Sequence, residues 1–216
     1  MSLYAGLDVG TQSVKLVVYD PAQRQVVATM AAPMALTSRE DGTREQQASW
    51  WIEGVVACFA GLSSAQRAQL RGIAVSGQQH GFVPVAADGT VTAPVKLWCD
   101  TSTQAECAAI LAAVGGVAGA VAAAGNPVLT GYTASKLPWT RRHRPEAYAA
   151  MATILLPHDY VNFWLTGERF MEAGDASGTG WLDVRTRRWS APLLAAIDGT
   201  RDLREALPPL VEAGTV

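Results

Sequence analysis

The chain has 216 residues, of which 49% are apolar and only 17% are charged. This balance supports a large buried core and differs from the composition of disordered chains. The formal net charge of −2 gives no electrostatic reason to expect binding to nucleic acid or to an anionic membrane. The length fits one ordinary domain or two small ones. Three cysteines without metal-type spacing are typical of reduced thiols in a cytosolic protein.

The N-terminal segment predicts three β-strands, because apolar and β-branched residues alternate with short polar turns. We expect these strands over Leu3–Asp8, Ser13–Asp20 and Gln25–Met30, joined as an antiparallel meander. Met1 leads straight into the first strand, without the charged and apolar segments of a signal peptide.

The middle of the chain predicts helices and strands in turn. In chain order we expect a helix from Ser49 to Leu62, strands at Leu70–Val75, Gly81–Val85 and Val95–Trp98, and a helix at Thr101–Val114 capped by Thr101 or Ser102. The glycine-interrupted stretch at 112–125 is too short and too rich in glycine for a membrane span.

The second half predicts mainly short helices. We expect them at Ala134–His143, Pro145–Met151, His158–Thr166 and Ser190–Ala196, with short strands at Thr153–Leu156 and Trp181–Asp183. Pro138 is expected near the first turn of its helix, Ser190 as a helix cap, and the last residues, LPPLVEAGTV, as a loop. The pattern predicts an α/β fold with a mixed sheet flanked by helices.

The stretch DVGTQSVK, residues 8–15, places a carboxylate before a turn of small residues. Backbone N–H groups beside Gly10 and Thr11 could approach phosphate oxygens closely, and Asp8 could hold Mg²⁺ through water. The alternative is an ordinary hairpin turn, in which Asp and Gly are favoured for conformational reasons. Taken alone, the segment favours the ordinary turn.

The stretch VSGQQHGF, residues 75–82, places Gln79 and His80 after a strand and between glycines. Polar side chains at the end of a sheet strand lie where α/β proteins bind ligands, and Gln and His offer donors and acceptors to hydroxyl groups. A loop histidine satisfied by its own surroundings is the alternative, and the segment does not decide between the two.

Three further stretches carry polar residues of interest. In KLWCDTS, Asp100 is expected to cap the following helix, with a pocket wall as the alternative. In GYTASKLPW, Lys136 fits either an interior ion pair or the surface, and Trp139 is expected on the same side of the helix. In GDASGTGWLDV, Asp175 and Ser177 are expected in a capped short helix packed closely against a neighbour.

Taken in this order, the motifs resemble the FGGY family of carbohydrate kinases over essentially the whole chain. GQQHG, LPHDY and DASGTGWLDV favour its xylulokinase branch over the glycerol kinases, whose corresponding loop carries an Arg-Glu pair. The family's lysine-containing signature departs at Thr140, where an apolar residue is usual. It matches at Gly131, Thr133, Lys136, Trp139, Arg142 and His143.

The resemblance implies an actin-like, ribonuclease H-like domain, the first of two that face each other across a cleft. Residues 1–216 would be an incomplete N-terminal, sugar-binding domain that lacks the C-terminal ATP-binding domain. The family's proton-accepting aspartate would lie beyond the end of the chain, so the chain alone would be inactive.

The resemblance also implies roles for particular residues. Asp8 would help to hold the Mg²⁺–ATP phosphates through water, Gly10 and Thr11 would form the phosphate-binding hairpin, and Gln79 and His80 would contact the sugar. The implied reaction of the parent enzyme is cytoplasmic conversion of D-xylulose and ATP into D-xylulose 5-phosphate and ADP.

Three alternatives stay open. The first is a family member that acts on another ketose or a polyol. The second is a non-catalytic sugar-binding module, because sugar contacts are expected and the base is not. The third is a folding fragment that exposes apolar surface and dimerises through it.

Overall fold

A four-stranded sheet forms the larger core of the protein, and its strand order is β3-β2-β1-β6. The computed structural model describes residues 2–212. The four strands are β1 (Leu3–Val9), β2 (Ser13–Asp20), β3 (Gln25–Pro33) and β6 (Leu70–Gly77). The predicted antiparallel meander of β1, β2 and β3 is confirmed, and β3 continues beyond its predicted end at Met30.

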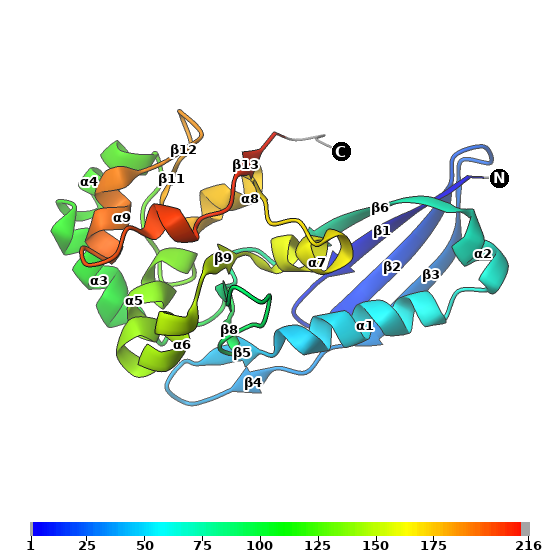
Figure 1. Cartoon of the computed structure of the whole chain (residues 1–216), viewed down its shortest axis with the longest axis horizontal. Coiled ribbons are helices and arrows are strands. Elements are labelled where there is room, and N and C mark those ends of the chain that lie inside the picture. Colours follow the sequence, from blue (N-terminus) through cyan, green and yellow to red (C-terminus); the bar gives the residue numbers. More distant parts are fainter. Residues whose placement is uncertain (1, 213–216) are drawn as a thin grey trace.

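One face of this sheet is covered by helices, because the apolar residues of β1 and β2 alternate with polar ones. Leu7 and Leu16 are among the buried residues, and they belong to the same cluster as Trp51 of helix α1 (Ala48–Ala60). Figure 1 shows α1 running along this face of the sheet. Asp8 belongs to the alternate, exposed set and therefore points to the opposite face.

Strands β1 and β6 are parallel, and this relationship positions the candidate site. Helices α1 and α2 (Ser64–Gln69) lie between β3 and β6 in the chain. Since Val9 pairs with Gly77, both strands end at the same edge of the sheet. The N–H of Gln78 donates to the carbonyl of Val9 at 2.8 Å. The turn after β1 and the loop after β6 are therefore neighbours.

The remaining strands are short and form small ribbons. Strand β5 (Arg44–Gln46) lies between β4 (Thr37–Ser38) and β8 (Val95–Lys96) and pairs with both. The other short strands form pairs: β7 (Val83–Val85) with β9 (Thr153–Leu155), β10 (Met171–Glu172) with β13 (Leu210–Val211), and β11 (Leu182–Asp183) with β12 (Arg188–Trp189). Strand β13 corrects the prediction of a C-terminal loop at Leu210–Val211, where pairing with β10 supplies a partner the sequence does not reveal. Residues 213–216 of that prediction lie outside the described residues.

Helices gather at the other end of the molecule from the sheet (Figure 1). They are α3 (Gln104–Ala113), α4 (Gly116–Ala124), α5 (Thr133–His143), α6 (Pro145–Ala150), α8 (Ala173–Ala176), α9 (Ala191–Ile197) and the 3₁₀ turns η1 (Ser177–Thr179) and η2 (Leu203–Ala206). Helix α7 (Pro157–Thr166) instead lies against the sheet, beside β6 and α1. A second buried cluster, which includes Phe82, Leu137 and Trp181, holds the helical end together. The predicted α/β class, with a mixed sheet flanked by helices, is confirmed.

The structure corrects three predictions about helix ends. Helix α3 begins after Thr103, whose side chain makes no capping bond, so neither Thr101 nor Ser102 caps it. Pro138 lies in the second turn of α5, beyond the position predicted for it. Ser190 does occupy the N-cap position of α9, but its hydroxyl donates to the carbonyl of Ala123 instead of capping the helix. The hydroxyls of Thr103 and Ser190 bond to distant segments, at Ser135 and Ala123, instead of capping their own helices.

Within residues 2–212, no single helix has both the length and the apolar character needed to cross a membrane. Helices α3 and α4 taken together have the required length and apolar composition, but the chain bends by 76° between them.

Candidate functional site

The turn after β1 leaves two backbone donors free. The N–H of Gly10 donates to the carbonyl of Ser13 at 3.0 Å and closes the turn. No hydrogen bond among the described residues engages the N–H of Thr11 or Gln12. Asp8 precedes this turn on the exposed face of the sheet. A carboxylate beside free N–H groups suits a hydrated cation that accompanies an anion.

Buried side chains fix this turn against the loop after β6. The hydroxyl of Thr11 donates to the Oε1 of Gln78 at 2.9 Å and accepts from the Nε1 of Trp98 at 3.0 Å. The amide of Gln78 donates to the Oε1 of Gln46 at 2.8 Å, and that oxygen also accepts from the Nε1 of Trp51. The Nε2 of Gln46 completes the link by donating to the carbonyl of Thr11 at 2.8 Å.

The two glutamines of the loop after β6 have opposite environments. Gln78 is buried and hydrogen-bonded, whereas Gln79, the predicted sugar contact, is exposed. Gln79 is therefore free to face a ligand. Sequence reasoning missed the structural role of Gln78, and the alternation along β6 gives no signal for it, because the strand ends at Gly77, before both glutamines.

His80 is held between two elements. Its backbone φ is +63°, a left-handed conformation uncommon for a residue with a side chain. The imidazole meets the ring of Tyr132 edge-on, with centroids 4.6 Å apart. A Cβ at Gly178 would collide with the same imidazole, so His80 requires glycine at that position. The ring is thus confined by the start of α5 and by η1.

Burial, reinforced by the positive charge of Lys136, lowers the pKa of His80 to about 4 despite the opposing charge of Asp175. His80 is therefore neutral at physiological pH, with one ring nitrogen as a donor and the other as an acceptor. A neutral imidazole of this kind can exchange hydrogen bonds with a hydroxyl group.

Lys136 is completely buried, and neither environment predicted for it is right. Its Nζ donates to the carbonyls of His80, at 2.6 Å, and Gly131, at 2.8 Å, so it is neither on the surface nor in an ion pair. Burial lowers the pKa of Lys136 to about 7, while the charge of Asp100 opposes the change.

The predicted close packing of the DASGTG segment is confirmed. Helix α8 is capped by Glu172, whose carboxylate accepts from the N–H groups of Gly174 and Asp175. Asp175 also accepts a hydrogen bond from the Nδ1 of His158 at 2.7 Å. A Cβ at Gly77 would meet His158 at 2.9 Å, so this pair lies directly beside β6.

His158, Asp159 and Asp175 are the described residues grouped closely enough to hold a metal ion, with ligand atoms within 4.8 Å of one another. Burial lowers the pKa of His158, but the hydrogen bond to Asp175 and the charge of Asp159 outweigh it, so the pKa lies above its ordinary value. Burial raises the pKa of Asp159 to about 7, against the effect of His158. The hydrogen bond between His158 and Asp175 already holds two of these three side chains together.

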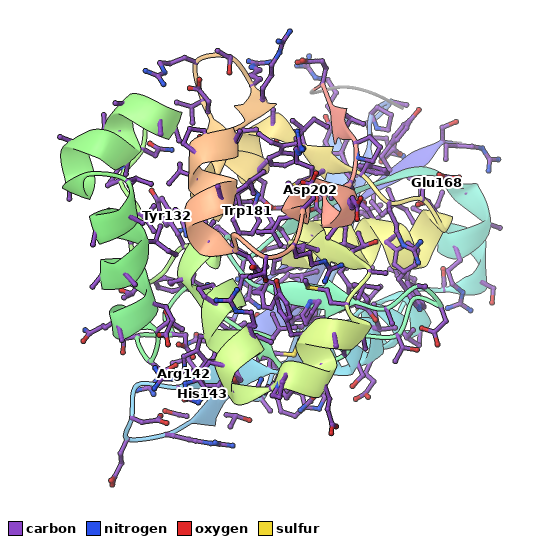
Figure 2. The ribbon with its side chains drawn as sticks, turned by 60° about the vertical axis from the view of Figure 1, so that its left-hand side comes forward. Tyr132, Arg142, His143, Glu168, Trp181 and Asp202 are labelled. Atoms are coloured by element: carbon purple, nitrogen blue, oxygen red, sulfur yellow. The ribbon has the colours of Figure 1, made fainter. Side chains whose placement is uncertain are left out.

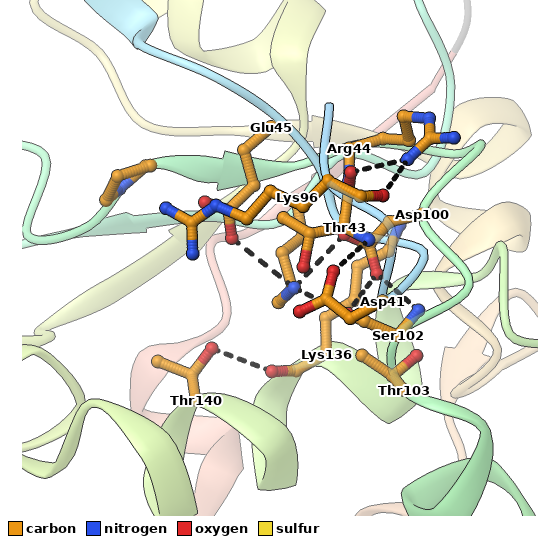
Figure 3. A network of polar contacts seen from close by, with 12 residues as sticks. Asp41, Thr43, Arg44, Glu45, Lys96, Asp100, Ser102, Thr103, Lys136 and Thr140 are labelled. Atoms are coloured by element: carbon orange, nitrogen blue, oxygen red, sulfur yellow. Dashed lines mark hydrogen bonds and ion pairs between the residues drawn. The ribbon is translucent and has the colours of Figure 1, made fainter. Parts of the chain in front are cut away.

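A buried ionic network braces the segment that carries Trp98, and Figure 3 shows it above α5. Lys96 Nζ lies 3.1 Å from Asp100 and 3.3 Å from Glu45, and it sits 3.7 Å from the ring centroid of Trp139. Arg144 donates to both carboxylate oxygens of Glu45. The prediction of Asp100 as a helix cap is wrong, because α3 begins after Thr103; the Asp100 carboxylate accepts from the N–H of Ser102 and from Lys96.

Three of the signature residues, Trp139, Arg142 and His143, contact groups other than His80. Arg142 and His143 are exposed at the C-terminal end of α5, where Figure 2 shows them at the surface of the helical end. Trp139 stacks on His143 with centroids 4.5 Å apart and faces Lys96, whereas Lys136 reaches His80. The structure thus brings together Gly10, Thr11 and the loop of Gln79 and His80, with Asp8 at the end of β1.

Comparison with known proteins identifies the family of the chain. Residues 3–216 match the family model described as the FGGY family of carbohydrate kinases, N-terminal domain. The chain is 38% identical to the xylulose kinase of Haemophilus influenzae, over 98% of the chain and 44% of that protein. It is 33% identical to the xylulose kinase of Escherichia coli, over 95% of the chain and 42% of that protein. The chain therefore spans less than half the length of these relatives.

Solved structures share the fold. A crystal structure of xylulose kinase from Rhodospirillum rubrum matches with a TM-score of 0.87 and 29% identity, over 97% of this chain and 42% of that one. Glycerol kinase from Plasmodium falciparum, solved with ADP, matches with a TM-score of 0.85 at 17% identity, over 97% of this chain and 43% of that one. The second likeness concerns the fold alone.

Proposed function

Because the chain belongs to the FGGY family of carbohydrate kinases, we propose that it is the sugar-binding, N-terminal domain of an ATP-dependent xylulose kinase. The proposed reaction transfers the γ-phosphoryl group of ATP to the terminal hydroxyl of D-xylulose and gives D-xylulose 5-phosphate and ADP. In this proposal a further, C-terminal domain binds ATP, as the relatives' greater length leads us to expect.

The observation that carries the proposal is the meeting of two loops at one edge of the sheet. The Gly10–Thr11 turn and the Gln79–His80 loop follow parallel, paired strands and are linked through Thr11 and Gln78. One loop offers free backbone N–H groups suited to phosphate, and the other offers hydroxyl-binding side chains. A kinase needs both functions within reach of one another, because phosphoryl transfer depends on positioning and charge stabilisation.

We assign the chemical roles as follows. Gln79 and neutral His80 bind and orient the sugar. The free N–H groups of the turn would bind phosphate oxygens, and Asp8 would hold Mg²⁺ through water. When bound, Mg²⁺ neutralises charge that develops on the phosphates. The hydroxyl proton passes to a carboxylate outside this chain, so we expect the 216-residue chain alone to bind sugar without turnover.

Calorimetric titration of the 216-residue chain with D-xylulose tests the sugar assignment, with D-ribulose and glycerol as comparators. We expect selective heat of binding for D-xylulose. Tighter binding of another sugar would contradict the choice of D-xylulose and indicate a kinase for a different ketose or polyol. Absence of binding to every sugar would contradict the assignment of the sugar site to this domain.

Two substitutions test the residues. His80→Ala should weaken sugar binding, while the matched change His143→Ala, at an exposed position on α5, should not. Asp8→Ala, in an enzyme that contains this chain and its C-terminal domain, should reduce turnover and spare sugar binding. Normal turnover of that variant would remove Asp8 from the site.

A further inference from the structure

Lys136 is a buried cation whose hydrogen-bond partners are backbone carbonyls. Its side chain has no exposed surface, and no carboxylate among the described residues forms an ion pair with it. A buried ammonium without a carboxylate is costly, and such groups are kept where they have a task. The other buried lysine, Lys96, has two carboxylate partners. The arrangement around Lys136 therefore needs a separate explanation.

The first carbonyl that Lys136 binds belongs to the residue we assign to the sugar. The oxygen of His80 accepts from the Nζ of Lys136 at 2.6 Å and from the hydroxyl of Thr133 at 3.2 Å. His80 has a left-handed backbone, which persists only where its surroundings enforce it. Both donors come from the first turns of α5 and hold that carbonyl toward the helix.

The second carbonyl belongs to the segment that confines the imidazole. The Nζ of Lys136 donates to the carbonyl of Gly131 at 2.8 Å, directly before Tyr132. The ring of Tyr132 meets the imidazole of His80 edge-on. One ammonium group thus fixes two backbone segments, far apart in the sequence, whose side chains contact each other.

We propose that Lys136 is a positioning residue for the sugar site, which sets the orientation of His80 and Tyr132 by holding the carbonyls of His80 and Gly131. The inference rests on the proposed function, since it assumes that His80 faces the sugar. Lys136 itself acts through the backbone and does not contact the ligand.

The test compares Lys136→Met with Lys96→Met in the full 216-residue chain. Both changes remove a buried ammonium and keep a side chain of similar volume, but only Lys136 binds the carbonyl of His80. We expect Lys136→Met to weaken D-xylulose binding roughly tenfold, the equivalent of about one lost hydrogen bond to a charged group. Lys96→Met should lower the unfolding midpoint and leave sugar affinity unchanged.

A second readout does not require sugar. The imidazole NMR signals of His80 should move in Lys136→Met, and the pKa of His80 should rise from about 4 toward its ordinary value, because the charge of Lys136 no longer lowers it. Neither should change in Lys96→Met. If the unmodified chain bound no sugar, the proposed function would fail while this measurement still decided the role of Lys136.

Two further variants guard against a failure to fold. Thr133→Val removes the other donor to the same carbonyl and should reproduce a weaker form of both effects. Lys136→Gln retains a side-chain N–H donor and should recover part of the affinity. Unchanged His80 signals in Lys136→Met and Thr133→Val, or sugar affinity that falls equally in Lys96→Met, would overturn the inference.

Discussion

The indole Nε1 of Trp98 lies 3.0 Å from the hydroxyl of Thr11, a residue 87 positions earlier in the chain. The same hydroxyl donates to the Oε1 of Gln78. Three loops, after β1, β6 and β8, therefore meet at one oxygen atom. The turn that we assign to phosphate is held by the two segments beside it.

Thr11→Val should loosen this meeting point without unfolding the protein. Valine keeps the shape but removes one acceptor and one donor, which we expect to cost about 1–2 kcal/mol of unfolding free energy. The indole N–H resonance of Trp98 should shift, because its acceptor is lost. Thr29→Val, at an exposed position of β3, should leave both stability and that resonance nearly unchanged. An unmoved Trp98 resonance in Thr11→Val would show that the bond does not form in solution.

Gln46→Leu should be among the most destabilising single changes in the sheet region. Its buried amide makes four hydrogen bonds, to Trp51, Gln78 and the carbonyls of Thr11 and Ala35. Leucine would leave those groups unpaired, and we expect a loss of about 2–5 kcal/mol in denaturant unfolding. Gln47→Leu is the matched control, since that side chain is exposed and makes no capping bond. Equal effects at both positions would contradict the network.

Lys96→Met should break the buried ionic network shown in Figure 3. The change leaves the carboxylates of Glu45 and Asp100 buried without their shared cation, although Arg144 still pairs with Glu45. Removing one partner of a buried pair typically costs about 3–5 kcal/mol. Lys15→Met, at an exposed strand position, should change the unfolding free energy by less than about 0.5 kcal/mol. A small effect at Lys96 would mean that the network contributes little to stability.

Gly178→Ala should displace the imidazole of His80 and reduce sugar binding. The added Cβ would occupy the place of the ring, which can move because it is the end of a side chain. We therefore expect a folded protein with weaker affinity for D-xylulose in calorimetry. Gly6→Ala adds the same methyl group in open space on β1 and serves as the control. Retained affinity in Gly178→Ala would show that the orientation of His80 is not needed for binding.

The two partly buried histidines, His80 and His158, should give the unfolding free energy opposite dependences on pH. The pKa of His80 is about 4 in the folded state and near 6.5 when unfolded, so the unfolded state binds more protons between these values. Its contribution is therefore lost as the pH falls from about 6.5 toward 4. The pKa of His158 is raised on folding, so its contribution is present below about pH 6.5 and is lost as the pH rises through the folded pKa.

Denaturant unfolding of single variants measures these contributions. His80→Gln should flatten the stability profile on the acid side, and His158→Gln should flatten it toward higher pH. If the unfolding free energy depended on pH in the same way in both variants and in the unmodified chain, the pKa shifts given to His80 and His158 would be refuted.

The strands and helices could largely be predicted from local patterns. The apolar residues of Leu3–Asp8 predicted a strand, and the structure has one at Leu3–Val9 with Leu3, Ala5 and Leu7 buried. The ranges predicted for α1, α5, α6 and α7 also agree with the observed helices to within one or two residues at each end. Short ribbons such as β10 with β13 escaped prediction, because two-residue strands carry no period and depend on a partner far along the chain.

Side-chain environments were harder to predict from sequence. Gln78 and Gln79 are the same residue type in adjacent positions, yet one is buried and one is exposed. Lys136 suited an ion pair or the surface, and the structure gives it two carbonyls instead. Asp100 had the local features of a helix cap, but α3 begins after Thr103 and the Asp100 carboxylate forms an ion pair with Lys96. Each outcome depends on a residue that arrives from another segment.

The sequence by itself determined the class of the fold, the family, and the two loops at which chemistry is expected, because these features are written in local periodicity and ordered motifs. Only the tertiary structure decided which side chains of these loops are exposed and which are buried in hydrogen-bonded contacts. The pairing of Val9 with Gly77 joins the turn of Thr11 to the loop of His80. The physical reason is that burial and hydrogen-bond partners arise between distant segments, and they exist only after the chain has folded.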